Sequence, residues 1–168
     1  MRSNPVLLLT LSWLGCAAQR PAVPPQAGDP SDAVIARIAT IHGGAGPWVV
    51  AGYRMGEYAL RRLGLPPGSF DLEVVHHSPP KVQYTCIADG AAAATGASLG
   101  KLNLSLAPEE EASRVGTTYR RRSTGASVTL RPTAAFVARY RDLPRERLAE
   151  AGREVLTLPE AEVLEEVF

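Results

Sequence analysis

The chain has 168 residues, and its 18 lysines and arginines nearly balance its 17 aspartates and glutamates, for a formal net charge of +1 at pH 7. This balance gives no electrostatic support for nucleic-acid binding, which needs a concentrated basic surface. The length suits one domain with its own core behind a short leader. A basic run at residues 120–122 and an acidic one at 160–166 are predicted to be solvated faces.

The N-terminus resembles an export signal. An apolar run at residues 6–14 follows a short, weakly positive leader. The run is too short to span a bilayer, which takes about 20 residues, but it suits the core of a signal peptide. It ends at Cys16 in a context similar to a bacterial lipobox, with Trp13 where a leucine is usual. We therefore expect residues 1–15 to be a lipoprotein signal peptide. Cys16 is then lipidated, and the protein is exported and membrane-anchored, facing the periplasm or the cell exterior.

Residues 16–30 are rich in proline and fit a flexible tether, which leaves residues 31–168 as the domain. Cys16 and Cys86 are the two cysteines of the chain. If Cys16 carries lipid, Cys86 has no partner for an intramolecular disulfide in a compartment that oxidises thiols. Its thiol is then buried, metal-bound, reactive or bridged to another chain.

The first half of the domain predicts two helices. Ser31 and Asp32 cap an amphipathic helix that runs to Ile41. Pro47 stands at the first position of a second helix, which continues to Leu63 before a glycine. Two further glycines, Gly52 and Gly56, lie on one face of this helix. We interpret them as a device for close packing against another backbone, because each costs about 1 kcal/mol of helix stability relative to alanine.

The remainder alternates between strand and helix patterns. Strands are predicted at residues 70–77 and 102–106, and a hairpin at 115–122 and 126–130, while helices are predicted at 86–94, 133–140, 145–156 and 160–167. This order shows no repeated strand–helix–strand rhythm. It favours an α+β fold, with an antiparallel sheet packed against several helices in a single domain.

Two glycine-bearing stretches carry the candidate chemistry. His42 stands just before a glycine turn, and Cys86 begins a predicted helix with Asp89 one turn on. A helix N-terminus would stabilise a Cys86 thiolate. These three side chains therefore predict one shared site. His76 and His77 point to opposite faces of a strand, so at most one of them can join it.

A third glycine stretch, Gly96 to Lys101, is not a phosphate loop. Three residues separate its glycines where that motif needs four, and Leu102 follows the lysine in place of Ser or Thr. Nucleotide hydrolysis is therefore not expected.

Several separated pieces of sequence resemble the E-subunit family of formylmethanofuran dehydrogenase over about residues 34–131. The pieces are, in order, His42-Gly-Gly-Ala-Gly-Pro47, Gly52-Tyr-Arg-Met-Gly56, Cys86-x-x-Asp89-Gly90 and Thr95-Gly-x-x-x-Gly-Lys101. The resemblance implies an α+β core domain, a homodimer and a His/Cys pocket that binds metal. The implied ligands are His42, Cys86 and Asp89, and the implied cofactor is a divalent transition metal: zinc, nickel or iron.

The sequence departs from the family pattern at three possible ligand positions. Gly44 stands where the family has a second histidine, and Gly46 and Ala97 stand where it has cysteines. The chain also has no cysteines for the C-terminal zinc finger that some members carry. A site with fewer protein ligands and open positions can still bind a metal together with a substrate.

Three functions follow as hypotheses. The first is an exported protein that binds a metal ion or small ligand at His42, Cys86 and Asp89, with Gly43, Gly44, Thr95 and Lys101 holding an anionic part of the ligand. The second is an interaction module with a vestigial site, whose glycine-bearing helix is a dimer face. The third is an enzyme with Cys86 as nucleophile, His42 as base and Asp89 orienting the imidazole. Whether the protein is an enzyme, and what its ligand is, stay open.

Overall fold

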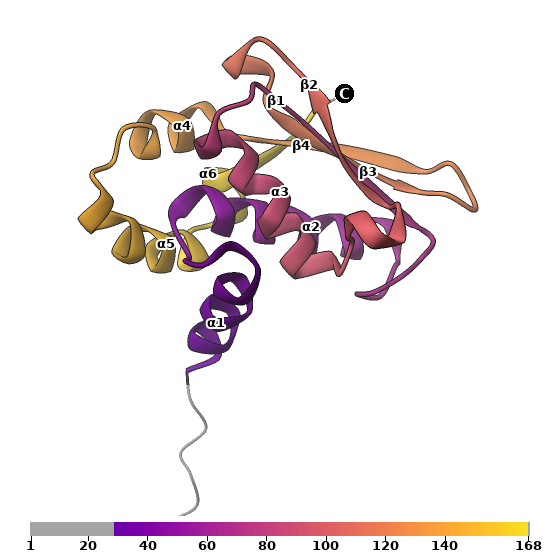
Figure 1. Ribbon diagram of the computed structural model, residues 1–168, viewed down its shortest axis with the longest axis horizontal. Coiled ribbons are helices and arrows are strands. Elements are labelled where there is room, and N and C mark those ends of the chain that lie inside the picture. Colours follow the sequence, from indigo (N-terminus) through magenta and orange to yellow (C-terminus); the bar gives the residue numbers. More distant parts are fainter. Residues whose placement is uncertain (1–28, 168) are drawn as a thin grey trace, which may run out of the picture.

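The computed structural model describes residues 29–167. The predicted signal peptide, the lipidation at Cys16 and nearly all of the proline-rich tether fall in residues 1–28, outside the described residues. In the described part, a five-stranded sheet has the strand order β2-β1-β3-β4-β5. Helices α2 and α3 lie against one face of this sheet (Figure 1). No helix of residues 29–167 is long and apolar enough to cross a membrane.

The elements follow one another along the chain from an N-terminal pair of helices to a C-terminal strand. The helices are α1 (Pro30–His42), α2 (Pro47–Leu63), α3 (Val82–Thr95), α4 (Ala134–Tyr140), α5 (Leu148–Thr157) and α6 (Glu160–Val163). The strands are β1 (Leu72–Ser78), β2 (Leu104–Pro108), β3 (Gly116–Arg121), β4 (Ser127–Pro132) and β5 (Leu164–Val167). Single 3-10 turns lie at Leu99–Lys101, Ala112–Arg114 and Arg145–Arg147.

The predicted α+β class is confirmed, and the sheet is mostly antiparallel. The pairs β1–β3, β3–β4 and β4–β5 run antiparallel. The pair β1–β2 is parallel, with α3 as the connection between its two strands. A single strand–helix–strand unit is therefore present, which the sequence pattern did not predict.

Two predicted elements are wrong in part. Helix α3 begins at Val82, four residues before Cys86. Residues 160–167 form a helix only as far as Val163, and the rest is strand β5, whose Leu164 pairs with Pro132 of β4. The glutamates of this segment favour a helix locally, but pairing with a strand far away in the sequence decides its second half.

Glycines bring α2 and α3 into backbone contact. A side-chain carbon at Gly52 would overlap the carbonyl oxygen of Ile87, and one at Gly90 would overlap that of Val49. Gly56 similarly faces Ala94, at 2.7 Å from an added carbon. The interpretation of Gly52 and Gly56 as a packing device is thus confirmed. Since α3 covers this face of α2, the glycines themselves are not open to a second copy of the chain, and the homodimer stays a prediction.

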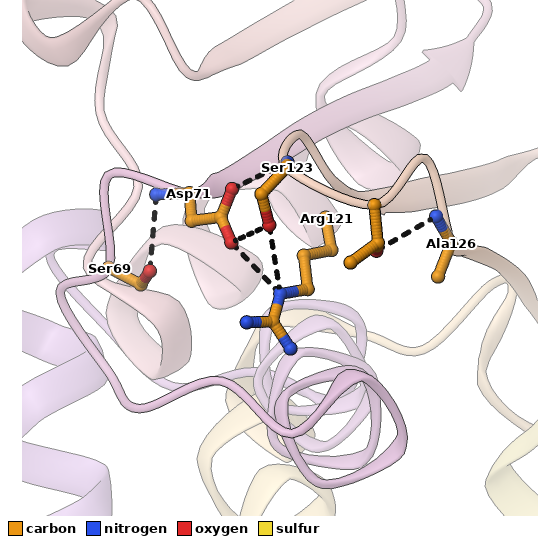
Figure 2. A network of polar contacts seen from close by, with 6 residues as sticks. Ser69, Asp71, Arg121, Ser123 and Ala126 are labelled. Carbon is orange, nitrogen blue, oxygen red and sulfur yellow. Dashed lines mark hydrogen bonds and ion pairs between the residues drawn. The ribbon is translucent and has the colours of Figure 1, made fainter.

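The β3–β4 hairpin is tied to the start of β1 by one carboxylate (Figure 2). Asp71 accepts hydrogen bonds from the backbone N–H of Ser123 at 2.7 Å, from the Ser123 hydroxyl at 2.6 Å and from Arg121 Nε at 2.9 Å. These bonds, those from Ser123 first, hold the pKa of Asp71 below its ordinary value. These bonds therefore attach the β3–β4 hairpin to the residue that precedes β1.

Both charged runs lie at the surface in ion pairs. In the basic run, Arg121 pairs with Asp71, and Arg120 and Arg122 pair with Glu73. The acidic C-terminal run is matched by arginines of α2 and β4, through the pairs Arg61–Glu160, Arg62–Glu166 and Arg131–Glu165. Exposed pairs of this kind contribute little stability, so the runs mainly keep two surfaces solvated.

Candidate functional site

A cavity of about 540 Å³ opens where the two ends of the domain meet. Its walls are the glycine turn between α1 and α2, the first turns of α3, and the segment from the end of α4 to the start of α5. Helix α5 packs beside α1 and α2, although about a hundred residues separate them along the chain (Figure 1). The cavity therefore exists only in the folded domain.

The turn that carries His42 follows from local chemistry. Gly43 adopts a left-handed φ of 82°, and its N–H donates to Ala39 O, which ends α1. Gly46 is the N-cap of α2 and Pro47 its first residue. Glycine suits the left-handed end of a helix, and proline suits the start of one. The four residues 43–46 thus place the end of α1 next to the start of α2.

His42 and Asp89 are in direct contact, as the shared-site prediction requires. The distance from His42 Nδ1 to Asp89 Oδ2 is 2.8 Å, and the side chains are 24% and 46% exposed. A carboxylate accepts from Nδ1–H, which leaves Nε2 as the available nitrogen of the ring. Cys86 lies one turn before Asp89 on α3 and lines the same cavity as His42. The structure therefore places His42 in contact with Asp89 and at the same cavity as Cys86, while Asp89 itself does not line the cavity.

Cys86 does not have the thiolate chemistry expected from its sequence position. Since α3 begins at Val82, Cys86 lies one turn inside the helix and away from the free N–H groups of its first turn. Burial first, and the charge of Asp89 second, raise the pKa of the thiol to about 11. At neutral pH the side chain is a protonated thiol, which is a poor nucleophile.

The donor set does not fit the metal centre that the family resemblance implies. Among residues 29–167, no three side chains of His, Cys, Asp or Glu are grouped so that they could hold a metal ion. Zinc sites in proteins use at least three such ligands. Here His42 and Cys86 are the two such donors that line the cavity, and Asp89 is bonded to His42 Nδ1. Gly44 and Gly46 line the cavity but supply no further ligand.

Two predicted ligand-binding residues lie elsewhere. Thr95 is at the far end of α3, where its hydroxyl donates to Ala91 O. Lys101 donates to Gly96 O at 2.9 Å, and its Nζ stands 5.1 Å from the centre of the Phe70 ring. Neither lines the cavity, whereas Gly43 and Gly44 both do.

The other two histidines are not among the residues that line the cavity. They lie on opposite faces of β1, as predicted. His76 is fully buried, with its ring nitrogens bonded to Thr117 Oγ1 and Tyr84 O, and His77 is partly exposed. Both side chains belong to strand β1 of the sheet and not to the candidate site.

Sequence reasoning missed the residues that complete the cavity. Gln83 lies on the first turn of α3, and Arg141 and Arg145 lie in the connection between α4 and α5. The nearest signal was the concentration of arginines around Pro144, between two predicted helices. No local pattern showed that this connection folds back onto His42.

Close packing holds in place the cavity wall formed by α5 and the end of α4, which is distant from His42 in sequence. A side-chain carbon at Gly152 of α5 would overlap the carbonyl oxygen of Ala45, so α5 touches the backbone of the glycine turn. Trp48 Nε1 donates to Tyr140 O at 2.9 Å, and the indole packs edge-on against Tyr84 and Phe136 with centroid distances of 5.2 Å. These contacts hold α5 against the glycine turn, and the end of α4 against the start of α2.

The comparisons with known proteins agree with this architecture. A family model described as "FmdE, Molybdenum formylmethanofuran dehydrogenase operon" matches residues 41–165. The matched span begins one residue before His42 and extends into β5. It therefore includes every residue named above as lining the cavity. A search of curated proteins finds no match.

Proposed function

The chain belongs to the FmdE family, and from this premise we propose that it binds a small organic molecule in the cavity beside His42 and Cys86. Its site differs from the metal pocket that the family resemblance implies. The His42–Asp89 pair supplies an oriented imidazole, and the protonated Cys86 thiol supplies a weakly polar wall. Both suit hydrogen bonding to a ligand.

One observation carries the proposal. Two of the positions where the family pattern has ligand side chains are glycines here, Gly44 and Gly46, and they leave room. A side-chain carbon at Gly44 would meet nothing within 4 Å, and one at Gly46 would meet only Leu148, at 3.7 Å. Packing therefore does not require glycine at either position. Their small size contributes to a cavity of about 540 Å³, which is within the range of small-molecule sites.

The raised pKa of Cys86 argues against the hypothesis of a Cys-nucleophile enzyme. Such enzymes lower the thiol pKa with a neighbouring cation or a helix N-terminus. Here the neighbouring charge is the Asp89 carboxylate, which raises it.

The experiment is a thermal-shift screen of the full chain against a collection of small molecules, with two matched tryptophan variants. Gly44→Trp places a ring in the cavity, while Gly100→Trp places one on an exposed turn that also has nothing within 4 Å. True ligands should stabilise the parent and Gly100→Trp but not Gly44→Trp. If every compound that stabilises the parent also stabilises Gly44→Trp, or if none stabilises the parent, the proposal fails.

Export and a lipid anchor complete the proposal. Their support is the apolar run at residues 6–14 and the lipobox-like context of Cys16. In a bacterial host, radiolabelled palmitate should enter the parent chain and not Cys16→Ser. Label in neither protein would overturn the lipid anchor. The homodimer implied by the family resemblance stays a prediction, which sedimentation analysis of the protein in solution would check.

A further inference from the structure

We infer that the ligand of this cavity carries an anionic head on an apolar body, as a medium-chain carboxylate or an alkyl phosphate does. The inference rests on the proposed function, since it assigns a chemical class to the ligand of the same site. Three independent features of the cavity support it: the sign of its charges, a buried hydrogen-bond donor without an acceptor, and the start of a long helix.

The charged side chains that line the cavity are all cationic. Arg141 and Arg145 contribute to its wall, and no aspartate or glutamate in the described part of the chain does. Within residues 29–167 neither arginine makes an ion pair, although arginines pair with acidic side chains elsewhere in the domain. Asp142 and Glu146 adjoin the arginines in sequence but do not line the cavity, and Asp89 is bonded to His42 Nδ1 through one of its oxygens. An anion entering the cavity would meet two guanidinium groups suited to carboxylate or phosphate.

Gln83 adds a donor that the protein itself does not satisfy. Its Nε2 is buried and has no hydrogen-bond partner among the described residues, yet the side chain lines the cavity. A buried donor without an acceptor costs on the order of 1–3 kcal/mol. As the structure stands this atom is closed to solvent, so an anionic oxygen of a ligand reaches it after the Gln83 side chain turns toward the cavity, and the bond would then remove this cost.

The same wall contains the start of α2, a helix of 17 residues. Its N-cap is Gly46, which offers no side-chain acceptor, and the first intrahelical bond runs from Val50 N–H to Gly46 O. The N–H groups before Val50 therefore lack helical partners, as at any helix start. Such groups favour an anion, which agrees with the charges of Arg141 and Arg145.

Several of the remaining lining side chains are apolar, and they indicate that the rest of the ligand is apolar. Val82 and Leu148 line the cavity, together with Leu143 and the Trp48 ring. Val82 is 78% exposed, which is unusual for a side chain of its kind at a helix start. A ligand with an alkyl or aryl body would cover this surface while its head group reaches the arginines.

Calorimetric titration of the full chain with three probes of equal chain length tests the inference: octanoate, octyl phosphate and the uncharged octanamide. At least one of the two anions should bind ten-fold or more tightly than octanamide. The variant Arg141→Gln/Arg145→Gln should lose that preference. The control Arg120→Gln/Arg122→Gln removes the same charge from the sheet surface and should keep it. Gln83→Leu should weaken the anion several-fold and leave octanamide unchanged.

The outcomes separate the ligand class from the site. Preference for octanoate identifies a carboxylate head, and preference for octyl phosphate a phosphate head. Equal binding of the anions and octanamide, lost in Gly44→Trp, would overturn the anionic head but leave the proposed function standing. Failure of both anions to bind would also overturn the inference, and the separate thermal-shift screen would then decide whether the cavity binds any small molecule. If both arginine double variants lost the preference for anions equally, the preference would come from the overall charge of the protein. That result would also overturn the inference.

Discussion

Cys86 and Asp89 lie one turn apart on α3, and burial first and the carboxylate second make the thiol slow to react. With a pKa of about 11, Cys86 should react with iodoacetamide at pH 7.5 about ten-fold or more slowly than free cysteine, because the thiolate is the reactive form. Asp89→Asn should raise the rate, since the carboxylate raises the pKa. The measurement is alkylation against pH in a Cys16→Ser background, so that Cys86 alone is labelled. A rate in the parent faster than that of free cysteine would restore the nucleophile hypothesis.

His76 makes the fold sensitive to mild acid. Burial lowers its pKa to about 4, while an unfolded histidine has an ordinary value of 6.5. The unfolded chain therefore binds the proton first, and stability is full above pH 6.5 and lost as the pH falls towards 4. The free energy of unfolding should drop by about 2 kcal/mol between pH 7.5 and pH 5 from this group.

Urea unfolding at several pH values checks this loss. His76→Gln should unfold more easily at pH 7.5 but show a flatter dependence on pH. His77→Gln, which changes the opposite face of the same strand, should retain the full dependence. The expectation is wrong if His76→Gln and the parent lose stability in parallel.

Gly44 and Gly46 explain why the site lacks a metal-binding donor set, and they allow it to be rebuilt. Both line the cavity with His42 and Cys86, and added side chains meet no close backbone. The variant Gly44→His/Gly46→Cys should therefore bind about one zinc ion per chain, because it brings the donors to four. Elemental analysis after incubation with zinc measures this. Zinc bound equally by the parent would show that the existing donors suffice.

The contact between α2 and α3 has almost no tolerance for extra atoms. A methyl group at Gly90 would overlap Val49 O and lie 2.6 Å from Tyr53 N, both of them backbone atoms. Gly90→Ala should lower the free energy of unfolding by about 3 kcal/mol, since two helices must move apart. Gly100→Ala, which meets nothing within 4 Å, should change it by less than about 0.5 kcal/mol. Thermal unfolding of both variants makes the comparison.

The elements that the sequence predicted well are those whose signals are local. Proline and glycine mark the two ends of α2, and Thr133 caps α4 by accepting from Phe136 N–H. The elements it missed depend on distant partners. Strand β5 exists because β4 pairs with it, and the parallel pairing of β2 with β1 depends on how α3 packs. Neither pairing can be predicted from the local sequence pattern.

The candidate site also contains residues that the local sequence predicted and residues that depend on distant packing. His42, Cys86 and Asp89 were predicted together because glycines adjoin each of them, and the contact of His42 with Asp89 agrees. Thr95 and Lys101 were grouped with them by nearness in sequence, but a helix of 14 residues separates its two ends by about 20 Å. Arg141 and Arg145 reach the cavity through the packing of α5, which no motif reveals.

Across the whole molecule, Arg54 joins the first half of the chain to the last helices. Its guanidinium donates to Val155 O at 2.8 Å and to Leu158 O at 2.6 Å, at the C-terminal end of α5. Arg54→Met should lower the free energy of unfolding by about 2 kcal/mol, because two carbonyls lose a charged donor.

The same change should increase amide hydrogen exchange in α5, which forms one wall of the cavity. Arg61→Met, on the exposed side of α2, is the matched control and should change exchange little. Equal effects of the two variants would mean that the contact with α5 adds nothing to its stability.

The close approach of Gly152 to Ala45 has a consequence for biosynthesis. The turn that carries His42 leaves the ribosome about a hundred residues before the helix that completes its surroundings. Helices α1, α2 and α3 contact one another and are synthesised before α5, so they are available to fold together first. A nascent chain that stops before residue 141 presents His42 and Cys86 without either arginine. The ligand can thus recognise only a chain whose later helices have been made, and cannot assist the earlier stages of folding.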